Sequence, residues 1–266
     1  MGGNSKYHFN QPIFVSARVS RMVPFPTMEL SMNASTFVLV PGAWHGGWVW
    51  NTVAARLRAQ GHRVTTPTLS GMGDRRREAT ADIGLPDHID DLEAHLFMED
   101  LDDVVLVGWS YGSFVAAGAA ARMPGKVRAI IYLDAIVPSS GCSVADYAAP
   151  ATKDFLATLA AESRLLAPIP FDVFGVTDAD VIAHVQPRLV DQPPRTFLEP
   201  MPSIVGIEAI AQAYVHCKRT NIPSVREGYE GFRNAGRGKV IELDVDHHCM
   251  LTAPEETVRA LIECLP

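Results

Sequence analysis

The fold of this chain is decided by residues 104–114, which read Val104-Val105-Leu106-Val107-Gly108-Trp109-Ser110-Tyr111-Gly112-Ser113-Phe114. The first four residues are continuously apolar, which is typical of a strand that is covered on both faces of a sheet. A run of small residues, 116–121, follows the stretch and favours a closely packed helix. The stretch therefore predicts a buried strand, a sharp turn of the form Gly-x-Ser-x-Gly, and a helix.

The turn itself points to a nucleophile. A strand that runs directly into a helix forces Ser110 into a strained backbone conformation, and Gly108 and Gly112 remove the β-carbons that would clash. The Ser110 hydroxyl is then raised above the sheet at a helix N-terminus, whose dipole favours developing negative charge. An incidental serine in a glycine-rich turn is the alternative, but the flanking strand and helix favour the nucleophile.

Outward from this turn, short apolar runs alternate with helical segments from Thr36 onward. This alternation predicts βαβ units and a doubly wound, mainly parallel sheet, hence an α/β fold. We expect strands at Phe37–Val40, Arg63–Thr66, Val104–Val107, Ala129–Leu133, Ala213–Val215 and Lys239–Leu243. We expect helices at Trp50–Ala59, Asp87–Glu99, Tyr111–Arg122 and Pro254–Cys264.

The alternation stops between residues 138 and 208. This part is rich in proline and contains two helical patterns, Ala145–Leu166 and Asp178–Val190. An insertion at this point would emerge at the carboxyl ends of the strands, where open α/β sheets bind ligands. The sequence thus predicts an N-terminal extension (1–34) and one domain (35–266) that carries a helical lid (138–208).

The turn around Ser110 resembles that of the α/β-hydrolase fold. The loop Pro41-Gly42-Ala43-Trp44-His45-Gly46-Gly47-Trp48 narrows the likeness to the branch that holds plant methyl esterases, hydroxynitrile lyases and many bacterial esterases. The resemblance extends from Thr36 to the C-terminus. It implies a cofactor-free site built on a serine, a histidine and an acid.

The same loop is expected to complete the oxyanion hole. A tetrahedral intermediate needs two backbone N–H donors directed at its oxygen, and the residue after the nucleophile, Tyr111, supplies one. The resemblance places the second donor at Ala43. Pro41 stands where the family usually has histidine, and we interpret His45 and Trp48 as packing of the loop.

A hydroxyl nucleophile needs a base, most often histidine. The C-terminal stretch Asp246-His247-His248-Cys249-Met250-Leu251 is similar to the family's Asp-His-x-x-Met-Leu pattern, which assigns His247 as the base and leaves His248 as its competitor. Adjacent histidines seldom bind one ion together, and no other ligand spacing is present, so we expect no metal site.

The acid departs from the family pattern. Related enzymes commonly carry it in the loop after the strand before the last one, and here residues 214–223 contain no carboxylate. The apolar strand 129–133 ends in Asp134, 24 positions after Ser110, and some α/β-hydrolases resemble this arrangement. We therefore predict Asp134 as the acid, against the alternative that it merely caps a turn before Pro138.

The composition argues against nucleic-acid binding and membrane insertion. With 23 basic and 30 acidic residues the net charge is −7, and the longest basic run is residues 75–77, so nucleic-acid binding is not expected. The apolar runs are too short to span a membrane. Four cysteines lie far apart, which favours reduced thiols and a cytoplasmic protein. A homodimer is left open.

These features together predict a serine hydrolase that cleaves a carboxylic ester or lactone of a small, largely apolar substrate. A non-catalytic binding protein of the same fold is the main alternative. A hydroxynitrile lyase is less favoured, since His248 and Gly42-Ala43 replace the lysine and hydroxyl residue of those enzymes. The apolar group of the substrate is expected to meet the lid residues Phe155, Leu165, Leu166, Phe171, Phe174 and Phe197.

Overall fold

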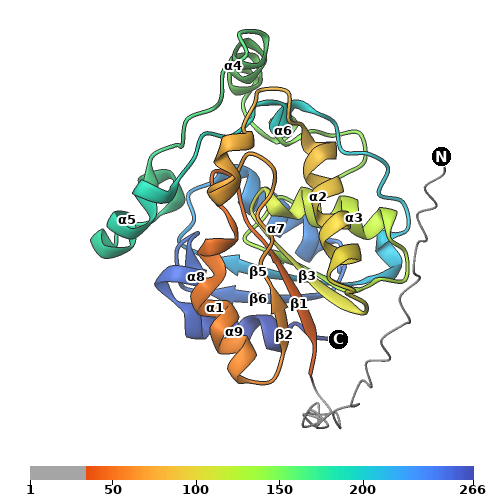
Figure 1. Ribbon diagram of the computed structural model, residues 1–266. Coiled ribbons are helices and arrows are strands. Elements are labelled where there is room, and N and C mark those ends of the chain that lie inside the picture. The colour runs from red at the N-terminus through yellow and green to blue at the C-terminus, as the bar shows by residue number, and fades with distance from the viewer. Residues whose placement is uncertain (1–33) are drawn as a thin grey trace, which may run out of the picture.

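The computed structural model describes residues 34–266, so the predicted N-terminal extension lies outside the described residues except for Ala34. Its centre is a six-stranded sheet in the order β2-β1-β3-β4-β5-β6, with every neighbouring pair parallel (Figure 1). The six predicted strands are all present. They are β1 (Thr36–Val40), β2 (Arg63–Thr65), β3 (Val104–Trp109), β4 (Val127–Leu133), β5 (Ala211–Cys217) and β6 (Lys239–Leu243).

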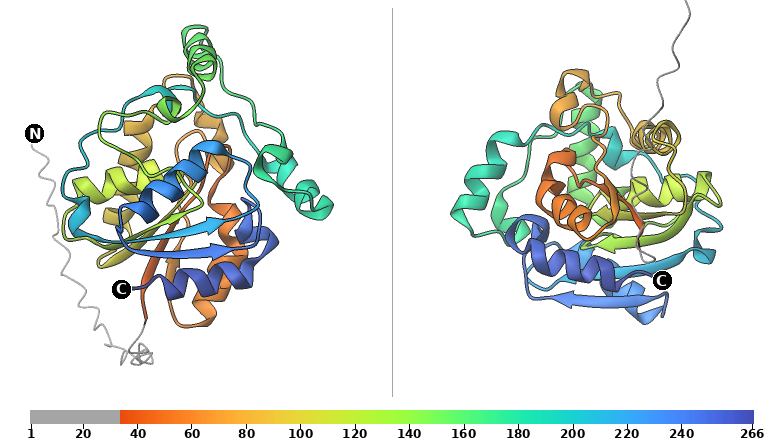
Figure 2. Two further views of the ribbon diagram at one scale, coloured as in Figure 1. Left: turned by 180° about the vertical axis from the view of Figure 1, so that it is seen from behind. Right: turned by 60° about the horizontal axis from the view of Figure 1, so that its bottom comes forward.

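Helices cover both faces of this sheet, as the continuous apolar strands require (Figures 1 and 2). Alternate residues of a strand enter opposite cores: Val105 and Val107 pack in one cluster, and Leu106 packs in the other. One cluster includes α1 (Asn51–Ala59), α8 (Cys249–Thr252) and α9 (Pro254–Glu263), and the other includes α2 (Leu85–Met98), α3 (Gly112–Arg122) and α7 (Pro223–Asn234).

Four of these six helices agree with the prediction; the short α8 was not predicted, and the longer α7 was missed. Its glycines, Gly228 and Gly231, lower helix propensity and hide the pattern. The apolar face is nevertheless regular, since Val225, Tyr229 and Phe232 are all buried against the sheet. Tertiary packing of that face stabilises a helix that local propensity alone does not predict.

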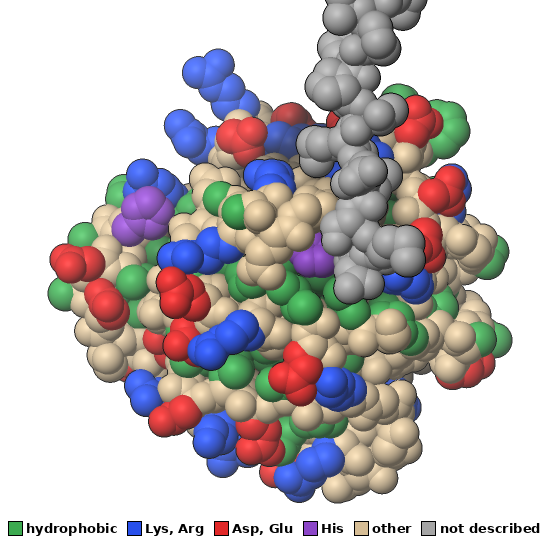
Figure 3. Space-filling view, turned by 90° about the horizontal axis from the view of Figure 1, so that it is seen from below, with side chains coloured by type: hydrophobic (Ala, Val, Ile, Leu, Met, Phe, Trp, Pro, Cys, Tyr) green, Lys and Arg blue, Asp and Glu red, His purple; other side chains and the backbone are tan. Residues whose placement is uncertain are grey.

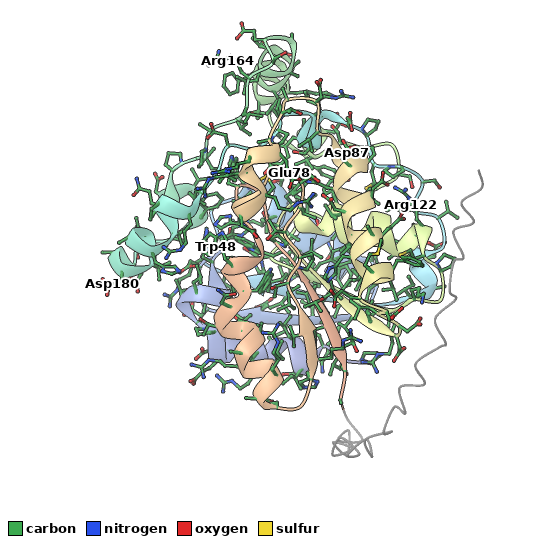
Figure 4. The ribbon with its side chains drawn as sticks, in the orientation of Figure 1. Trp48, Glu78, Asp87, Arg122, Arg164 and Asp180 are labelled. Atoms are coloured by element: carbon green, nitrogen blue, oxygen red, sulfur yellow. The ribbon has the colours of Figure 1, made fainter. Side chains whose placement is uncertain are left out.

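A helical insertion does follow the Asp134 strand, but its helices are shorter than predicted. The first, α4 (Pro150–Ala161), begins at a proline and is followed by Ser163 in a left-handed conformation, φ 54°. The insertion also contains α5 (Ala179–Val185) and α6 (Arg195–Leu198). Arg164 and Asp180, labelled in Figure 4, mark its two outlying parts. The limits 138–208 and 35–266 stay predictions. The 3₁₀ turns of the chain are η1 (Gly47–Trp50), η2 (Gly73–Glu78), η3 (Val144–Tyr147), η4 (Phe171–Phe174), η5 (Gln186–Arg188) and η6 (Ile207–Ala209).

The strand order brings the carboxyl ends of three neighbouring strands, β1, β3 and β4, together at one end of the sheet. From β1 the chain passes outward to β2 and then returns to the other side of β1 as β3, so the order reverses at the β1–β3 pair. Ligand crevices form at such reversals, beyond the carboxyl ends of the strands. In this register Val40 pairs with Gly108 and Trp109 pairs with Leu133, so Ser110 and Asp134 leave the sheet side by side.

Two observations concern the classes of function that the composition disfavours. No helix within residues 34–266 is both long enough and apolar enough to cross a bilayer. On the face drawn in Figure 3, Lys and Arg side chains lie interspersed with Asp and Glu. The absence of nucleic-acid binding stays a prediction from the net charge.

Candidate active site

Ser110 occupies a strained turn between β3 and α3, with a positive φ of 53°. A β-carbon on Gly108 would lie 2.6 Å from Cα of Ser113, and one on Gly112 would lie 2.6 Å from the carbonyl oxygen of Pro41. Both glycines are therefore required by close backbone approach. The Ser110 N–H donates to the carbonyl of Leu133 at 3.2 Å, which fixes the turn against the end of β4.

Asp134 and His247 meet directly beside this turn. The fully buried carboxylate of Asp134 accepts a hydrogen bond through Oδ2 from Nδ1 of His247 at 2.7 Å. The imidazole stacks on Phe174, with ring centroids 5.4 Å apart, and the His247 carbonyl accepts from Trp109 Nε1 at 2.9 Å. The expected acid–base contact is thus formed, and His247 is held by residues of β3 and of the insertion.

The second oxygen of Asp134 has its own donors. Oδ1 accepts from the Cys217 N–H at 3.0 Å and from His216 Nδ1 at 3.3 Å. Burial opposes the charged carboxylate, but the hydrogen bonds from His216, His247 and Cys217 outweigh it and hold the pKa of Asp134 below its usual value. Asp134 is therefore an ionised acid, and its partners on β5 were not foreseen from the sequence.

The loop after β1, residues 41–46, lies against Ser110 and is called the oxyanion loop below. A β-carbon on Gly42 would lie 3.2 Å from the Cβ of Ser110. Within residues 34–266 the backbone N–H groups of Ala43 and Tyr111 donate to no protein acceptor. Two uncommitted donors next to a raised hydroxyl are what an oxyanion hole needs.

Trp44 ties the oxyanion loop to the insertion. It adopts a left-handed conformation with φ 63°, and its N–H donates to Oε1 of the buried Gln192 at 2.9 Å. The Trp44 indole N–H donates to the Leu166 carbonyl at 3.1 Å, while the Trp44 carbonyl accepts from the Val190 N–H at 3.1 Å. Gln192 was not predicted, because no local motif marks it.

The Tyr111 side chain is fixed from the opposite side by a buried histidine. Nε2 of His88 lies 2.9 Å from the Ser70 carbonyl, which can only accept, so Nδ1 of His88 accepts from the Tyr111 hydroxyl at 2.9 Å. Burial lowers the pKa of His88 to about 4, so the ring is neutral near pH 7. This contact holds the side chain of the residue that directly follows Ser110.

The competitor base, His248, is engaged elsewhere. Its Nε2 lies 3.2 Å from Nε2 of His45, and Nδ1 of His45 donates to the Ala43 carbonyl at 2.6 Å. Because that tautomer leaves Nε2 of His45 as an acceptor, His248 donates to it. His45 thus packs in the loop and also holds the carbonyl of Ala43. Of the two adjacent histidines, His247 alone contacts Asp134.

Metal binding finds no geometric support in the described part of the chain. No group of three or more His, Cys, Asp or Glu side chains within residues 34–266 is arranged to hold an ion. His247 and His248 have different partners, Asp134 and His45. The absence of a metal and of a cofactor stays a prediction, which prolonged dialysis against EDTA checks through the activity.

The buried histidines predict a loss of stability in mild acid. Burial lowers the pKa of both His45 and His88 to about 4, whereas in the unfolded chain each titrates near its usual value of 6.5. Between these values the unfolded state binds more protons, so the free energy of unfolding falls as the pH drops from about 6.5. At pH 5 the loss is about 2 kcal/mol for each histidine.

Urea unfolding at pH 7.5 and at pH 5 measures this effect. The matched control is His88→Gln. It replaces the imidazole with an amide, which can still form hydrogen bonds but does not titrate. This variant is expected to lose less stability on acidification than the parent. Equal stability of the parent at the two pH values would contradict the prediction.

A cavity of about 300 Å³ opens beside Ser110 between the sheet and the insertion. Four of the six apolar residues expected from the lid line it, namely Phe155, Leu166, Phe174 and Phe197, whereas Leu165 and Phe171 do not. No charged side chain is part of its wall. The remaining lining residues are Ala43, Trp44, Tyr111, Ile136, Val144, Ala145, Ala148, Thr152, Leu156, Ile169, Val173, Ile222, Ser224 and Val225.

Comparison with known proteins agrees with this fold. Residues 37–260 match the model of the alpha/beta hydrolase family, and the chain belongs to this family. It is 35% identical over 238 residues to the carbendazim hydrolyzing esterase of Nocardioides sp. (strain SG-4G), a match that covers 85% of this chain and 98% of the relative.

Plant relatives confirm the predicted branch of the family. Methylesterase 10 of Arabidopsis thaliana is 40% identical over 105 residues, 38% of each protein, and an alpha-hydroxynitrile lyase of the same plant is also similar. Among solved structures, an extracellular alpha/beta-hydrolase from a Paenibacillus species superposes with a TM-score of 0.76 at 23% identity, covering 86% of this chain and 98% of that one. This last likeness concerns the fold.

Proposed function

We propose that this chain is a serine esterase in which Ser110, His247 and Asp134 form the catalytic triad. The chain is an ester hydrolase, since the relative that it matches over most of its length is an esterase. The observation that carries the triad is the 2.7 Å hydrogen bond between the ionised Asp134 and His247, formed beside the strained turn of Ser110.

The reaction proceeds through an acyl-enzyme. Ser110 Oγ bonds to the carbonyl carbon of the ester while its proton passes to Nε2 of His247, and Asp134 stabilises the resulting imidazolium. The N–H groups of Ala43 and Tyr111 bind the oxyanion. The carbon–oxygen bond to the alcohol then breaks, and the alcohol leaves with the proton from His247. Water, deprotonated by His247, releases the acid and restores Ser110.

The substrate is a small, uncharged ester or lactone. The cavity beside Ser110 is walled by aromatic and aliphatic side chains and has no charged group to pair with an ionised substrate. Burying an unpaired charge there costs several kcal/mol, which selects against charged acyl groups. Its hydroxyl groups, other than that of Ser110, come from Thr152, Ser224 and Tyr111, and that of Tyr111 is engaged with His88.

We expect p-nitrophenyl pentanoate to be hydrolysed at least about 100-fold faster, in kcat/KM, than the p-nitrophenyl monoester of succinate. The two acyl groups have similar length, and only the second carries a carboxylate, whose desolvation is not compensated in the cavity. Steady-state kinetics at pH 7.5 measures the ratio. Equal values for the two esters would show that the acyl group does not enter this cavity.

Covalent labelling tests the nucleophile independently of the substrate. A fluorophosphonate probe is expected to modify Ser110 at a stoichiometry of one, as read by mass spectrometry of the peptides. Saturable binding of a small ligand without turnover, together with the absence of labelling, would instead favour the non-catalytic binding protein. The formed Asp134–His247 contact gives no support to that alternative.

The proposal extends to the compartment and the assembly. All four cysteines are free, and Cys217, Cys249 and Cys264 are buried, which suits a reducing compartment such as the cytoplasm. Cell fractionation with an antibody against the chain tests the location. Sedimentation of the purified protein distinguishes a monomer from a homodimer.

A further inference from the structure

Asp134 is held by two histidines, and we propose that the second of them, His216, is a positioning residue that fixes the orientation of the Asp134 carboxylate for His247. This inference rests on the proposed triad, because it assigns a role relative to that acid. His216 touches neither the cavity beside Ser110 nor His247 itself among the recorded contacts. Its effect on catalysis therefore passes through Asp134.

The two oxygens of Asp134 have different hydrogen-bond partners. Oδ2 faces His247, whereas Oδ1 faces β5, where His216 Nδ1 and the Cys217 N–H donate to it. The Asp134 N–H also donates to the Val215 carbonyl at 2.7 Å. Rotation of the carboxylate would break hydrogen bonds on both sides, so the donors on β5 determine the direction in which Oδ2 presents its lone pairs.

The position of the acid explains the need for this second donor. In the related enzymes that the sequence resembles, the acid follows the strand before the last one, which here is β5. In this chain no acid follows β5. Strand β5 pairs with β4, and its residue His216 donates instead to Asp134 at the end of β4. A fully buried carboxylate at the end of β4 has no water to solvate it, and polar groups of β5 replace that solvation.

His216 is itself held rigidly. Its ring stacks on Tyr229 of α7, with centroids 4.1 Å apart and planes 11° from parallel, and the side chain is 9% exposed. Tyr229 in turn donates a hydrogen bond to Glu242 and lies under the guanidinium of Arg233. An immobilised ring with Nδ1 directed at an acceptor is suited to positioning.

The groups that face His216 come from four elements. Asp134 faces it from the end of β4, Glu242 is its partner in the β6 register, and Tyr229 covers its ring from α7. Tyr214 of β5 lies 6.4 Å away between ring centroids, and Arg233 lies behind Tyr229. Asp134 is the one hydrogen-bond partner of the His216 side chain among the described residues.

The electrostatics of Asp134 agree with this role. Against the opposing effect of burial, the hydrogen bond from His216 is the leading influence that lowers the pKa of Asp134. Without that donor the pKa of Asp134 rises. A carboxylate with a higher pKa is protonated at a higher pH, so the acid limb of the kcat/KM profile, where activity falls as the pH drops, is then expected to move to higher pH.

Two substitutions separate positioning from packing. His216→Phe keeps a ring that stacks on Tyr229 but removes the donor, whereas His216→Asn removes the ring but keeps an N–H group near the position of Nδ1. We expect His216→Phe to lower kcat about ten- to a hundredfold, with KM within about threefold of the parent. The acid limb of its kcat/KM profile should lie at higher pH than that of the parent. His216→Asn is expected to recover most of kcat and the parental profile. His216→Leu repeats the loss of the donor in a smaller side chain.

The control is His95→Leu, which removes a hydrogen bond of a partly buried histidine to Thr65 on the opposite edge of the sheet. It is expected to leave the pH profile unchanged. A purely structural His216 predicts the reverse order, with Phe active and Asn impaired, and that result would overturn the inference. If Asp134→Asn is inactive while His216→Phe and His216→Leu match the parent, only this inference fails. Full activity of Asp134→Asn would remove the proposed triad instead.

Discussion

Ser110→Ala is expected to lose at least about 10⁴-fold in kcat while the protein stays folded. In the proposed mechanism the hydroxyl is the atom that forms the acyl-enzyme, and loss of a triad nucleophile costs this factor or more in other serine hydrolases. Serine and alanine are similar in size, and the hydrogen bond from the Ser110 N–H to the Leu133 carbonyl does not involve the side chain. The free energy of unfolding should therefore change by less than about 1 kcal/mol.

Hydrolysis of p-nitrophenyl pentanoate and urea unfolding measure both parts of this expectation. The matched control is Ser113→Ala in the same turn, since the Ser113 hydroxyl donates to the Ile136 carbonyl at 2.7 Å. That variant should lose stability but retain kcat within about tenfold. Retention of most activity by Ser110→Ala, or probe labelling of another serine in it, would show that the nucleophile lies elsewhere.

Asp134→Asn is the second large effect, and we expect it to approach the defect of Ser110→Ala. The substitution keeps the volume but removes the charge that stabilises the imidazolium of His247. It also offers an NH₂ group to Nδ1, which favours the tautomer with its proton on the wrong nitrogen. In serine proteases the corresponding change costs about 10⁴ in kcat. Single-turnover kinetics with a p-nitrophenyl ester separates this slow acylation from weak binding.

Two nearby carboxylates serve as controls for Asp134. Asp246 accepts through Oδ1 from the His248 N–H at 2.8 Å and from the Thr252 hydroxyl at 3.2 Å, so it stabilises the start of α8. Glu227 is exposed on α7. Asp246→Asn and Glu227→Gln should each remain within about tenfold of the parent. A loss of about 10³-fold in either one, or normal hydrolysis by Asp134→Asn, would identify a different acid.

The elements that the sequence predicted are those whose signal is local. The strand, the turn and the start of the helix around Ser110 are encoded in eleven consecutive residues, and the inner strands β1, β3 and β4 stand out because both of their faces are buried. Asp134 was also found locally, as a polar residue at the end of an apolar strand. Its contact with His247, 113 positions away, was implied by the resemblance to α/β-hydrolases that carry the acid on this strand, and the structure contains this contact.

What the sequence did not predict depends on distant contacts. Gln192 is 148 positions from Trp44, and His216 is 82 positions from Asp134, so neither has a neighbour in sequence that explains it. The helix α7 was missed because its glycines lower the local helix propensity, whereas the helix is stabilised by the packing of its apolar face against the sheet. In the insertion, the end of the first helix was misplaced since Ser163 adopts a left-handed conformation, which its residue type does not indicate.

The hydrogen bond between Trp44 and Gln192 has a consequence for substitutions in the insertion. An outward swing of the insertion would remove the acceptor of the Trp44 N–H and the ring of Phe174 that stacks on His247. Access to the cavity and competence of the catalytic groups are therefore thermodynamically linked: a ligand that favours the closed insertion also favours the assembled site. We therefore expect a change in the insertion that admits a larger substrate to alter kcat together with KM.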